Sequence, residues 1–215
     1  MEILGKSHAA FLFFLAVFIV SGYNKKIIQR RIFLFMLQFD FAILYAIQDH
    51  LINPFFTLLM KAFTTMGNGG MIWIILSLGL LCFKKTRKAG LYGLIALILV
   101  AILNNGIIKA IVQRPRPFTY TEISLLISPP GGYSFPSGHT SSSFAAATAI
   151  FLQNRNIGIP ALILAALIGF SRLYFFVHFP SDVFVGMLEG ILTAFLVTKL
   201  ADQARKKLAS TSGKL

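Results

Sequence analysis

Long apolar runs separated by short polar segments dominate the chain. A helix that crosses the hydrocarbon core of a bilayer needs about 20 mostly apolar residues, with a range of roughly 17–25. Five runs reach or approach that length: 71–83 with a backward extension, 90–110, 137–152, 157–173 and 182–200. A shorter run, 9–23, has only Lys6 as a preceding cation and no A-x-A cleavage site after it, so we expect a retained helix instead of a signal peptide. The pattern predicts an all-α, polytopic membrane helix bundle with about six transmembrane helices.

The stretch 24–68 has a mixed pattern. Its polar residues are the cations Lys25, Lys26, Arg30 and Arg31, followed by Asp40, Asp49, His50 and Pro54. Because the latter group is costly in hydrocarbon, we expect amphipathic helices that lie in the outer interface over 36–68. The competing interpretation makes 32–48 a further span, with seven crossings and an external N-terminus. The Gly-rich segment 64–70 is expected to be only a turn, although it could also contribute to the mouth of a site.

Composition and charge support a membrane location. The mean hydropathy of +0.76 and the 13% share of charged residues are unlike those of a soluble domain of this length. The net charge of +13 comes from cations that cluster between apolar runs, at Lys84, Lys85, Arg87, Lys88, Arg205, Lys206 and Lys207. Such clusters are typical of cytoplasmic loops that face anionic headgroups, so we expect membrane lipids as partners, no nucleic acid and no obligate protein partner. The single cysteine, Cys82, is expected to be a packing residue.

The chain is expected to form a single membrane-embedded domain over 1–215. Its parts are an N-terminal helix and connector (1–35), interfacial helices (36–68), a catalytic helix core (69–200) and a basic cytoplasmic tail (201–215). Counting crossings from the basic clusters places 114–133 and 174–181 together on the extracytoplasmic side. Two segments far apart in sequence therefore meet at one membrane face.

The first polar island joins two cations to two prolines. Lys109 and Arg116 are seven residues apart, so a continuous helix would hold them on one face roughly 10 Å apart. Pro115 and Pro117 oppose regular helix at this point because each lacks a backbone donor and restricts its predecessor. We expect the chain to turn here and bring Arg116 back toward Lys109. Taken alone, the island also suits interfacial cations, and Arg114 fits that second interpretation better.

The second polar island reads SFPSGHT over 134–140, directly before an apolar helix. Pro136 suits the first helical position or the turn that leads into it. Ser137 and Gly138 would then offer backbone N–H groups at a helix N-terminus, which is a ready site for an anion. His139 follows, although a lone histidine is more often a structural residue.

The third polar island contains Ser171, Arg172, His178 and Asp182. His178 precedes Pro180, a residue that favours the start of a helix. Asp182, four residues after His178, is close enough to accept the proton of one ring nitrogen and fix the tautomer. An ionisable group at membrane depth is costly and is functional by default. The alternative is a helix-capping aspartate beside an interfacial histidine.

Together the islands supply the parts that phosphoryl transfer needs. Cations and oriented N–H groups hold the equatorial oxygens, a nucleophile attacks in line, and an acid protonates the departing oxygen. Two of the four histidines fall in these islands; His8 and His50 are left as surface or interfacial residues. The residues alone do not decide which histidine is the nucleophile.

The three islands resemble the three motifs of the type-2 phosphatidic acid phosphatase superfamily. The motif K-x6-R-P is matched by Lys109, Arg116 and Pro117; P-S-G-H by Pro136, Ser137, Gly138 and His139; and S-R-x5-H-x3-D by Ser171, Arg172, His178 and Asp182. The motifs span 109–182, and the helical pattern extends the resemblance from about residue 40 to residue 200. The first 35 or so residues match no motif.

The resemblance implies a role for each residue. His178 would attack phosphorus and form a phosphohistidine, Asp182 would orient His178, and His139 would protonate the leaving oxygen and then help to activate water. The phosphoryl oxygens would be bound by Lys109, Arg116, Ser137, the Gly138 N–H and Arg172. We expect no metal and no cofactor, since the chain shows neither a carboxylate cluster nor a Cys/His ligand set. Vanadate, which resembles five-coordinate phosphorus, should inhibit.

The substrate class follows from the position of the site at the membrane face. The family offers polyprenyl diphosphate, phosphatidylglycerol phosphate, phosphatidic acid and sphingoid phosphates, and we favour undecaprenyl-type diphosphate. A vanadium haloperoxidase carries a similar motif set, but such enzymes are soluble and larger. The alternative outside enzymes is a protein that binds or transports a lipid phosphate without turnover.

Overall fold

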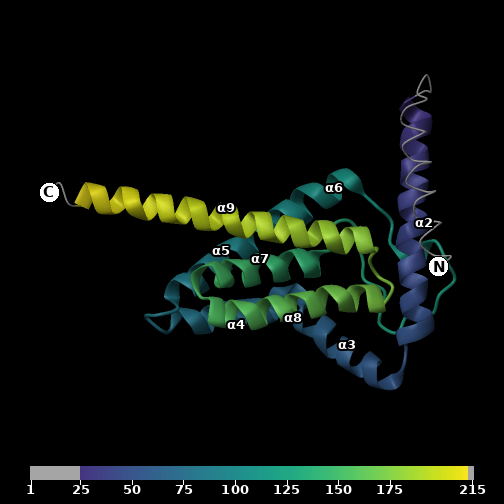
Figure 1. The fold of residues 1–215 in the computed structure, drawn as a ribbon, viewed down its shortest axis with the longest axis horizontal. Coiled ribbons are helices and arrows are strands. Elements are labelled where there is room, and N and C mark those ends of the chain that lie inside the picture. Colours follow the sequence, from purple (N-terminus) through teal and green to yellow (C-terminus); the bar gives the residue numbers. More distant parts are fainter. Residues whose placement is uncertain (1–24, 213–215) are drawn as a thin grey trace, which may run out of the picture. The chain divides into compact units, whose positions relative to one another are not determined.

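The structure is a computed structural model that describes residues 25–212. The helices are α2 (Lys25–Leu51), α3 (Pro54–Met66), α4 (Met71–Leu81), α5 (Arg87–Ala101), α6 (Lys109–Val112), α7 (Gly138–Gln153), α8 (Arg155–Tyr174) and α9 (Pro180–Ser212), with the short helical turns η1 (Asn68–Gly70), η2 (Ile102–Ile108) and η3 (Pro117–Thr119) (Figure 1). No strand occurs in this range, so the all-α class is confirmed. The chain divides between Asp40 and Phe41 into two units, and the site lies in the second.

Helix α7 is the central helix of the second unit. It packs against α5, α8 and α9, which surround it in Figure 1. Its inner faces are lined by alanines, and Ala145, Ala146, Ala147 and Ala149 are all fully buried. Small side chains let neighbouring helix backbones approach closely, as in other membrane bundles. The indole of Trp73 on α4 adds a buried hydrogen bond of 2.8 Å to the hydroxyl of Ser143 on α7.

The outer surface of the bundle is apolar. Large hydrophobic side chains such as Leu58, Ile98, Ile111 and Leu192 are 62–75% exposed, which suits contact with lipid. Among residues 25–212, three helical stretches are long and apolar enough to cross a membrane: Arg87–Thr119, Arg155–Tyr174 and Pro180–Lys207. A fourth is possible if Pro54–Met66 and Asn68–Leu81, which are bent by 51°, form one broken span. These stretches contain the expected runs 90–110, 157–173 and 182–200.

The other expected spans have different outcomes. Helix α4 has 11 residues, so the run 71–83 reaches the length of a span only with its backward extension through the bent pair. Helix α7 has 16 residues, so the run 137–152 forms a helix slightly below the usual length of a span. The run 9–23 lies outside the described residues. Over 25–51 the chain forms a single continuous helix, α2. The position of this segment in the interface, and the alternative of a further membrane span over 32–48, both remain predictions.

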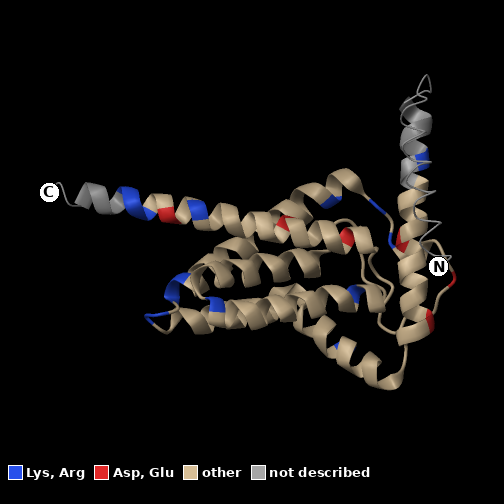
Figure 2. Cartoon of the chain, in the orientation of Figure 1, with Lys and Arg blue, Asp and Glu red and all other residues tan. Residues whose placement is uncertain are grey.

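Charge is unevenly distributed along the bundle. Figure 2 shows Lys and Arg gathered at the turn between α4 and α5 and on the C-terminal half of α9. A second group of basic residues lies near the end of the bundle where α8 leads into α9, and this group belongs to the polar islands.

Candidate active site

The connection from α8 to α9 presents His178. Pro180 begins α9, as its position in the sequence predicted. Phe176 lies in the left-handed region with φ of 58°, a conformation that is strained for a bulky residue and is found preferentially at functional sites. His178 is 2% exposed and Asp182 is fully buried. The third island is therefore an enclosed polar site rather than an interfacial pair.

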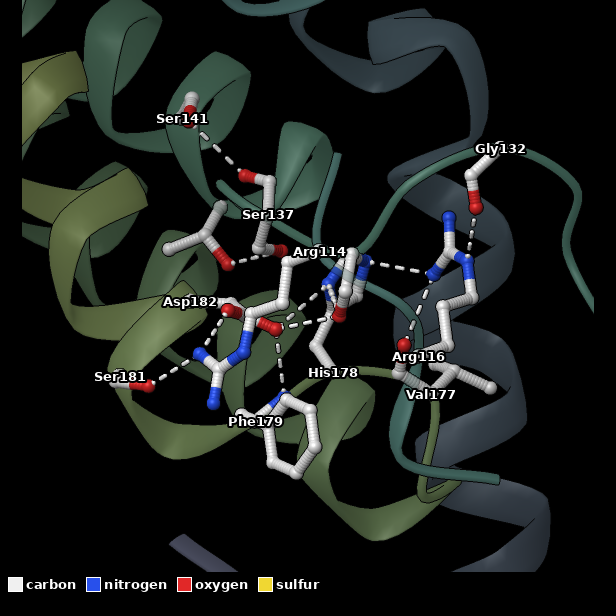
Figure 3. Close-up of polar contacts among 12 residues, drawn as sticks. Arg114, Arg116, Gly132, Ser137, Ser141, Val177, His178, Phe179, Ser181 and Asp182 are labelled. Carbon is white, nitrogen blue, oxygen red and sulfur yellow. Dashed lines mark hydrogen bonds and ion pairs between the residues drawn. The ribbon is translucent and has the colours of Figure 1, made fainter. Parts of the chain in front are cut away.

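Asp182 is held by three donors (Figure 3). Arg114 Nη1 donates to Oδ1 at 2.7 Å, while the Ser134 hydroxyl, at 2.5 Å, and the Phe179 backbone N–H, at 2.9 Å, donate to Oδ2. The same nitrogen of Arg114 donates to the hydroxyl of Ser181 at 2.7 Å. Interpreting Arg114 as an interfacial cation was therefore wrong, because its charge is used to fix the carboxylate. These contacts confirm that the segments 114–133 and 174–181 meet.

The expected direct hydrogen bond between His178 and Asp182 is not formed in this geometry. Nδ1 of His178 lies 3.7 Å from Oδ2, which is longer than a hydrogen bond, and 3.4 Å from the hydroxyl oxygen of Ser134. Because Ser134 also contacts the carboxylate, it lies between the two groups as a polar neighbour of both. The sequence interpretation included Ser134 in the second polar island but gave it no role.

The other ring nitrogen of His178 faces Arg116. Arg116 Nη1 lies 3.2 Å from Nε2 and donates to the Val177 carbonyl at 2.9 Å, while Nε donates to the Gly132 carbonyl (Figure 3). A guanidinium can only donate, so Nε2 must carry the lone pair and Nδ1 the hydrogen. The pKa of His178 is lowered from 6.5 to about 4, mainly by burial and further by Arg116 and Arg172, although Asp182 acts in the opposite direction. The ring is thus neutral near pH 7, with its lone pair on Nε2.

Helix α7 begins at Gly138, with Ser137 at the N-cap. The backbone N–H of Ser137 donates to the carbonyl of Asp182 at 3.1 Å, so the expectation that it would be offered to an anion was wrong. The hydroxyl of Ser137 accepts from Thr140 at 2.9 Å. Ser137 therefore ties the start of α7 to the start of α9, and the N–H groups that follow it define the helix N-terminus.

His139 stands on the first turn of α7 and contacts the turn η1. Its Nε2 lies 3.0 Å from Oδ1 of Asn68. Gly67 packs so closely that an added Cβ would come within 2.7 Å of the imidazole. The segment 64–70, which was expected to be only a turn, therefore borders the site. Gly69 and Gly70 have φ of 59° and 70°, which explains the choice of glycine in this turn.

Arg172 reaches the site from the last turn of α8. It is 3% exposed, and its Nη1 donates to the hydroxyl of Thr64 on α3. Its Nε has no hydrogen-bond partner among the described residues. A buried donor without a partner is costly, so this nitrogen is suited to a ligand oxygen.

Two cavities flank His139. One, of about 620 Å³, has polar lining residues that include Lys61, Thr64, Asn68 and Arg172. The other, of about 500 Å³, lies between α4, α5 and α7 and has apolar walls that include Leu97 and Ile98. Lys109 and Gly138 line the second cavity, and Lys109 Nζ donates to Asn105 Oδ1 at 3.2 Å. His139 thus lines both cavities, one with many polar groups and one with mostly apolar walls.

The residues expected from the three motifs all lie at this end of the bundle. The sequence interpretation missed or misjudged Arg114, Ser134, Thr64 and Asn68, which orient motif residues from other segments. Ser134 and Arg114 adjoin motifs in the sequence, so their proximity was a weak signal. Thr64 and Asn68 carried no such signal.

A helical bundle with an apolar surface and a buried cationic site at one end defines the chain as a membrane protein that handles an anionic group. The family model described as the PAP2 superfamily matches residues 89–206, and the chain belongs to this superfamily. The resemblance noted in the sequence is therefore confirmed.

Several known proteins are similar to this chain. An undecaprenyl-diphosphatase of Sulfolobus acidocaldarius is 35% identical over 131 residues, which cover 60% of this chain and 63% of that protein. Undecaprenyl-diphosphatase BcrC of Bacillus subtilis is 33% identical over 61% of this chain and 68% of its own length. A solved transmembrane PAP2-type phosphatidylglycerolphosphate phosphatase of Bacillus subtilis superposes with a TM-score of 0.64 at 26% identity, covering 91% of this chain and 95% of that one.

Proposed function

We propose that this protein is a membrane lipid phosphatase that works through a phosphohistidine on His178 and needs no metal ion. The main support for this proposal is the protonation state of the His178 imidazole ring. Nδ1 faces Ser134 and Asp182, and Nε2 keeps its lone pair toward Arg116. This arrangement gives a neutral nucleophile whose far nitrogen is beside a carboxylate.

In the first step, His178 Nε2 attacks phosphorus. His139 enters this step as an imidazolium, which the negative charge of the bound phosphoryl group stabilises. A P–N bond forms as the P–O bond to the leaving group breaks, and the electron pair goes to the leaving oxygen, which takes a proton from His139. Arg116, now 3.2 Å from Nε2, would turn its Nη1 to a phosphoryl oxygen. Asp182 stabilises the positive charge that His178 acquires.

In the second step, water attacks the phosphohistidine. His139, neutral after the first step, accepts a proton from this water as the new P–O bond forms. The P–N bond breaks, its electron pair returns to Nε2, and inorganic phosphate leaves. Both histidines are then back in their starting states.

The site carries its own positive charge for the transferred group. Lys109, Arg116 and Arg172 supply fixed cations, and the unpartnered Nε of Arg172 points to a further bond with a phosphoryl oxygen. The amino-terminal turn of α7 adds oriented N–H groups. Such donors can stabilise the charge on the equatorial oxygens, which is the task that a metal ion performs in other phosphatases.

We propose polyprenyl diphosphate as the substrate, ahead of phosphatidylglycerol phosphate and phosphatidic acid. The support is that the relatives named undecaprenyl-diphosphatase share 33–35% of aligned residues with this chain. The apolar cavity beside His139 would take the lipid side of the leaving group. The basic turn between α4 and α5 favours a cytoplasmic position for that end of the bundle. We therefore propose that the site faces the extracytoplasmic side.

The test is phosphate release by purified protein in detergent with EDTA present. The panel contains undecaprenyl diphosphate, phosphatidylglycerol phosphate and phosphatidic acid. We expect metal-independent release with the diphosphate preferred. Release that stops with EDTA and returns with a divalent cation would refute metal independence. Binding of these lipids by folded protein without any release would favour a transport or binding protein.

A further inference from the structure

A polar cluster lies inside the bundle, where α9 meets α7 and the π-helical turns before Lys109. Its centre is Glu189, seven residues beyond Asp182 on α9. Glu189 Oε2 accepts from Asn104 Nδ2 at 3.0 Å and from the Ser141 hydroxyl at 2.7 Å. A carboxyl group within a membrane-crossing helix is costly and calls for a function. None of the three polar motifs includes Glu189 or Asn104.

Close helix packing fixes Glu189 against α7. Gly186 and Gly190 flank it, one turn before and one residue after. A Cβ on Gly186 would lie 2.9 Å from the Ser137 carbonyl oxygen, and one on Gly190 would lie 2.5 Å from the Ser141 carbonyl oxygen. The backbones of α9 and α7 therefore touch at both glycines, and the carboxylate is held level with the first turn of α7.

The carboxylate determines how the Asn104 side chain is oriented. A carboxylate only accepts hydrogen bonds, so it holds the NH₂ group of Asn104 toward itself. That NH₂ group also contacts the Ser141 hydroxyl oxygen at 3.0 Å. Oδ1 of Asn104 is consequently turned the other way, to within 3.6 Å of the position that a Cβ on Gly138 would occupy. Lys109 Nζ lies 3.5 Å from that same position.

The backbone around Asn104 links the hydrogen bonds of its side chain to the position of Lys109. Residues Ile102–Ile108 form π-helical turns, and Lys109 follows them directly. π-Helical turns break the regular register of a helix and occur preferentially at functional sites. Asn104, which is 1% exposed, is the buried residue of this segment. Its hydrogen bonds therefore anchor the turn from which Lys109 enters the phosphate site.

We infer that Glu189 is a positioning residue for phosphoryl transfer: through Asn104 and Ser141 it holds Lys109 and the amino-terminal turn of α7 in register around the transferred phosphate. This inference rests on the proposed phosphatase function. Glu189 does not touch the substrate. Loss of Glu189 should lower the rate, because Lys109 and the N-terminus of α7 would no longer be held in the positions that stabilise the transition state.

Two substitutions at Glu189 distinguish the effect of its hydrogen bonds from the effect of its negative charge. Glu189→Gln removes the negative charge but keeps a side-chain oxygen that can accept from Asn104 or Ser141. Glu189→Leu removes both the charge and the acceptor. We expect the Gln variant to keep kcat within about 3-fold of wild type and the Leu variant to lose about 10- to 100-fold in kcat, with KM changed less.

Further variants guard against misfolding and test coupling. Ser141→Ala removes one hydroxyl and should lower kcat even if Glu189→Leu does not fold. Asn104→Leu combined with Glu189→Leu should cost little more than either change alone, because both break one network. The matched control is Thr198→Val on α9, since Thr198 Oγ1 has no hydrogen-bond partner in the described part of the chain. This control should keep the wild-type kcat.

The experiment is steady-state phosphate release in detergent, with thermal unfolding of every variant alongside. Equal losses in the Gln and Leu variants would overturn the inference in favour of a purely electrostatic effect. Wild-type kcat in Glu189→Leu and Ser141→Ala, with only a lower Tm, would overturn it in favour of a structural role. Absence of release from folded wild-type protein would instead contradict the proposed function itself.

Discussion

Arg114→Ala tests how strongly the site depends on a residue outside the three motifs. Arg114 is 14% exposed and pairs at 2.7 Å with Asp182, which is fully buried. Removing one partner of a buried ion pair typically costs 3–5 kcal/mol, because the other charge is left without its counter-ion. Asp182 retains two donors on Oδ2, from Ser134 and Phe179. We therefore expect the lower end, about 3 kcal/mol in the free energy of unfolding.

Arg114→Ala should also reduce turnover. Without the bond to Oδ1, the carboxylate can rotate about its remaining donors and move away from the side of His178 that it faces. A displacement of about 1 Å at a catalytic group can cost roughly 100-fold, so we expect a fall of this order in kcat. Arg114→Lys keeps the positive charge but loses the planar guanidinium with its several donors. Compared with Arg114→Ala, it should recover part of the lost stability and part of the lost kcat.

The assays are thermal unfolding in detergent and steady-state phosphate release. About 3 kcal/mol corresponds to a decrease in Tm of roughly 6–12 °C for a chain of this size. Arg155→Ala is the control, since this arginine lies 5.9 Å from the Phe151 ring at the junction of α7 and α8, away from the site. A wild-type Tm and kcat in Arg114→Ala would refute the reasoning.

Three further predictions follow from the geometry. His139→Ala should slow hydrolysis of an alkyl phosphate at least 10-fold more than that of p-nitrophenyl phosphate, because a good leaving group needs no proton; equal losses would contradict the role. The lowered pKa of His178 predicts that kcat/KM, corrected for substrate ionisation, declines only well below pH 6.5, towards about 4. Stability should decrease as pH falls from about 6.5 to about 4, because the unfolded chain takes up the proton below 6.5 and the folded protein only near 4. An acid limb of kcat/KM at or above 6.5, or a stability that stays constant over that range, would contradict the prediction. Cys82, which is exposed, should react with a membrane-impermeant maleimide only in inverted vesicles, whereas Tyr133→Cys in a Cys82→Ser background should react in intact cells. The reverse labelling pattern would contradict the proposed orientation.

The sequence predicted the fold class and the motif residues because these depend on local signals. Apolar length indicates a span, and Pro180 marks the start of α9. The spacing of His178 and Asp182 places both at one helix N-terminus. Such signals are contained within a few turns of the chain, so one sequence is enough to read them.

The support for these residues could not be read from the sequence, because it comes from distant segments. Ser134 contacts Asp182 across 48 residues, and Asn68 contacts His139 across 71. Arg114 was misjudged because a cation next to a membrane interface has an adequate local explanation. The N–H of Ser137 was misjudged for a similar reason: its partner, the Asp182 carbonyl, lies on another helix. Long-range partners depend on the packing of α7 and α9, which no local pattern specifies.

The most direct test of the account is rapid quenching of the protein during turnover, followed by mass spectrometry of the peptide that contains His178. Neutral-to-alkaline quenching keeps a phosphohistidine intact. We predict a phosphoryl group on His178 in wild-type protein, more of it in His139→Ala with a good leaving group, and none in His178→Ala, which should also be inactive. Near-normal turnover by His178→Ala, or a phosphoryl group on another residue, would contradict the central claim.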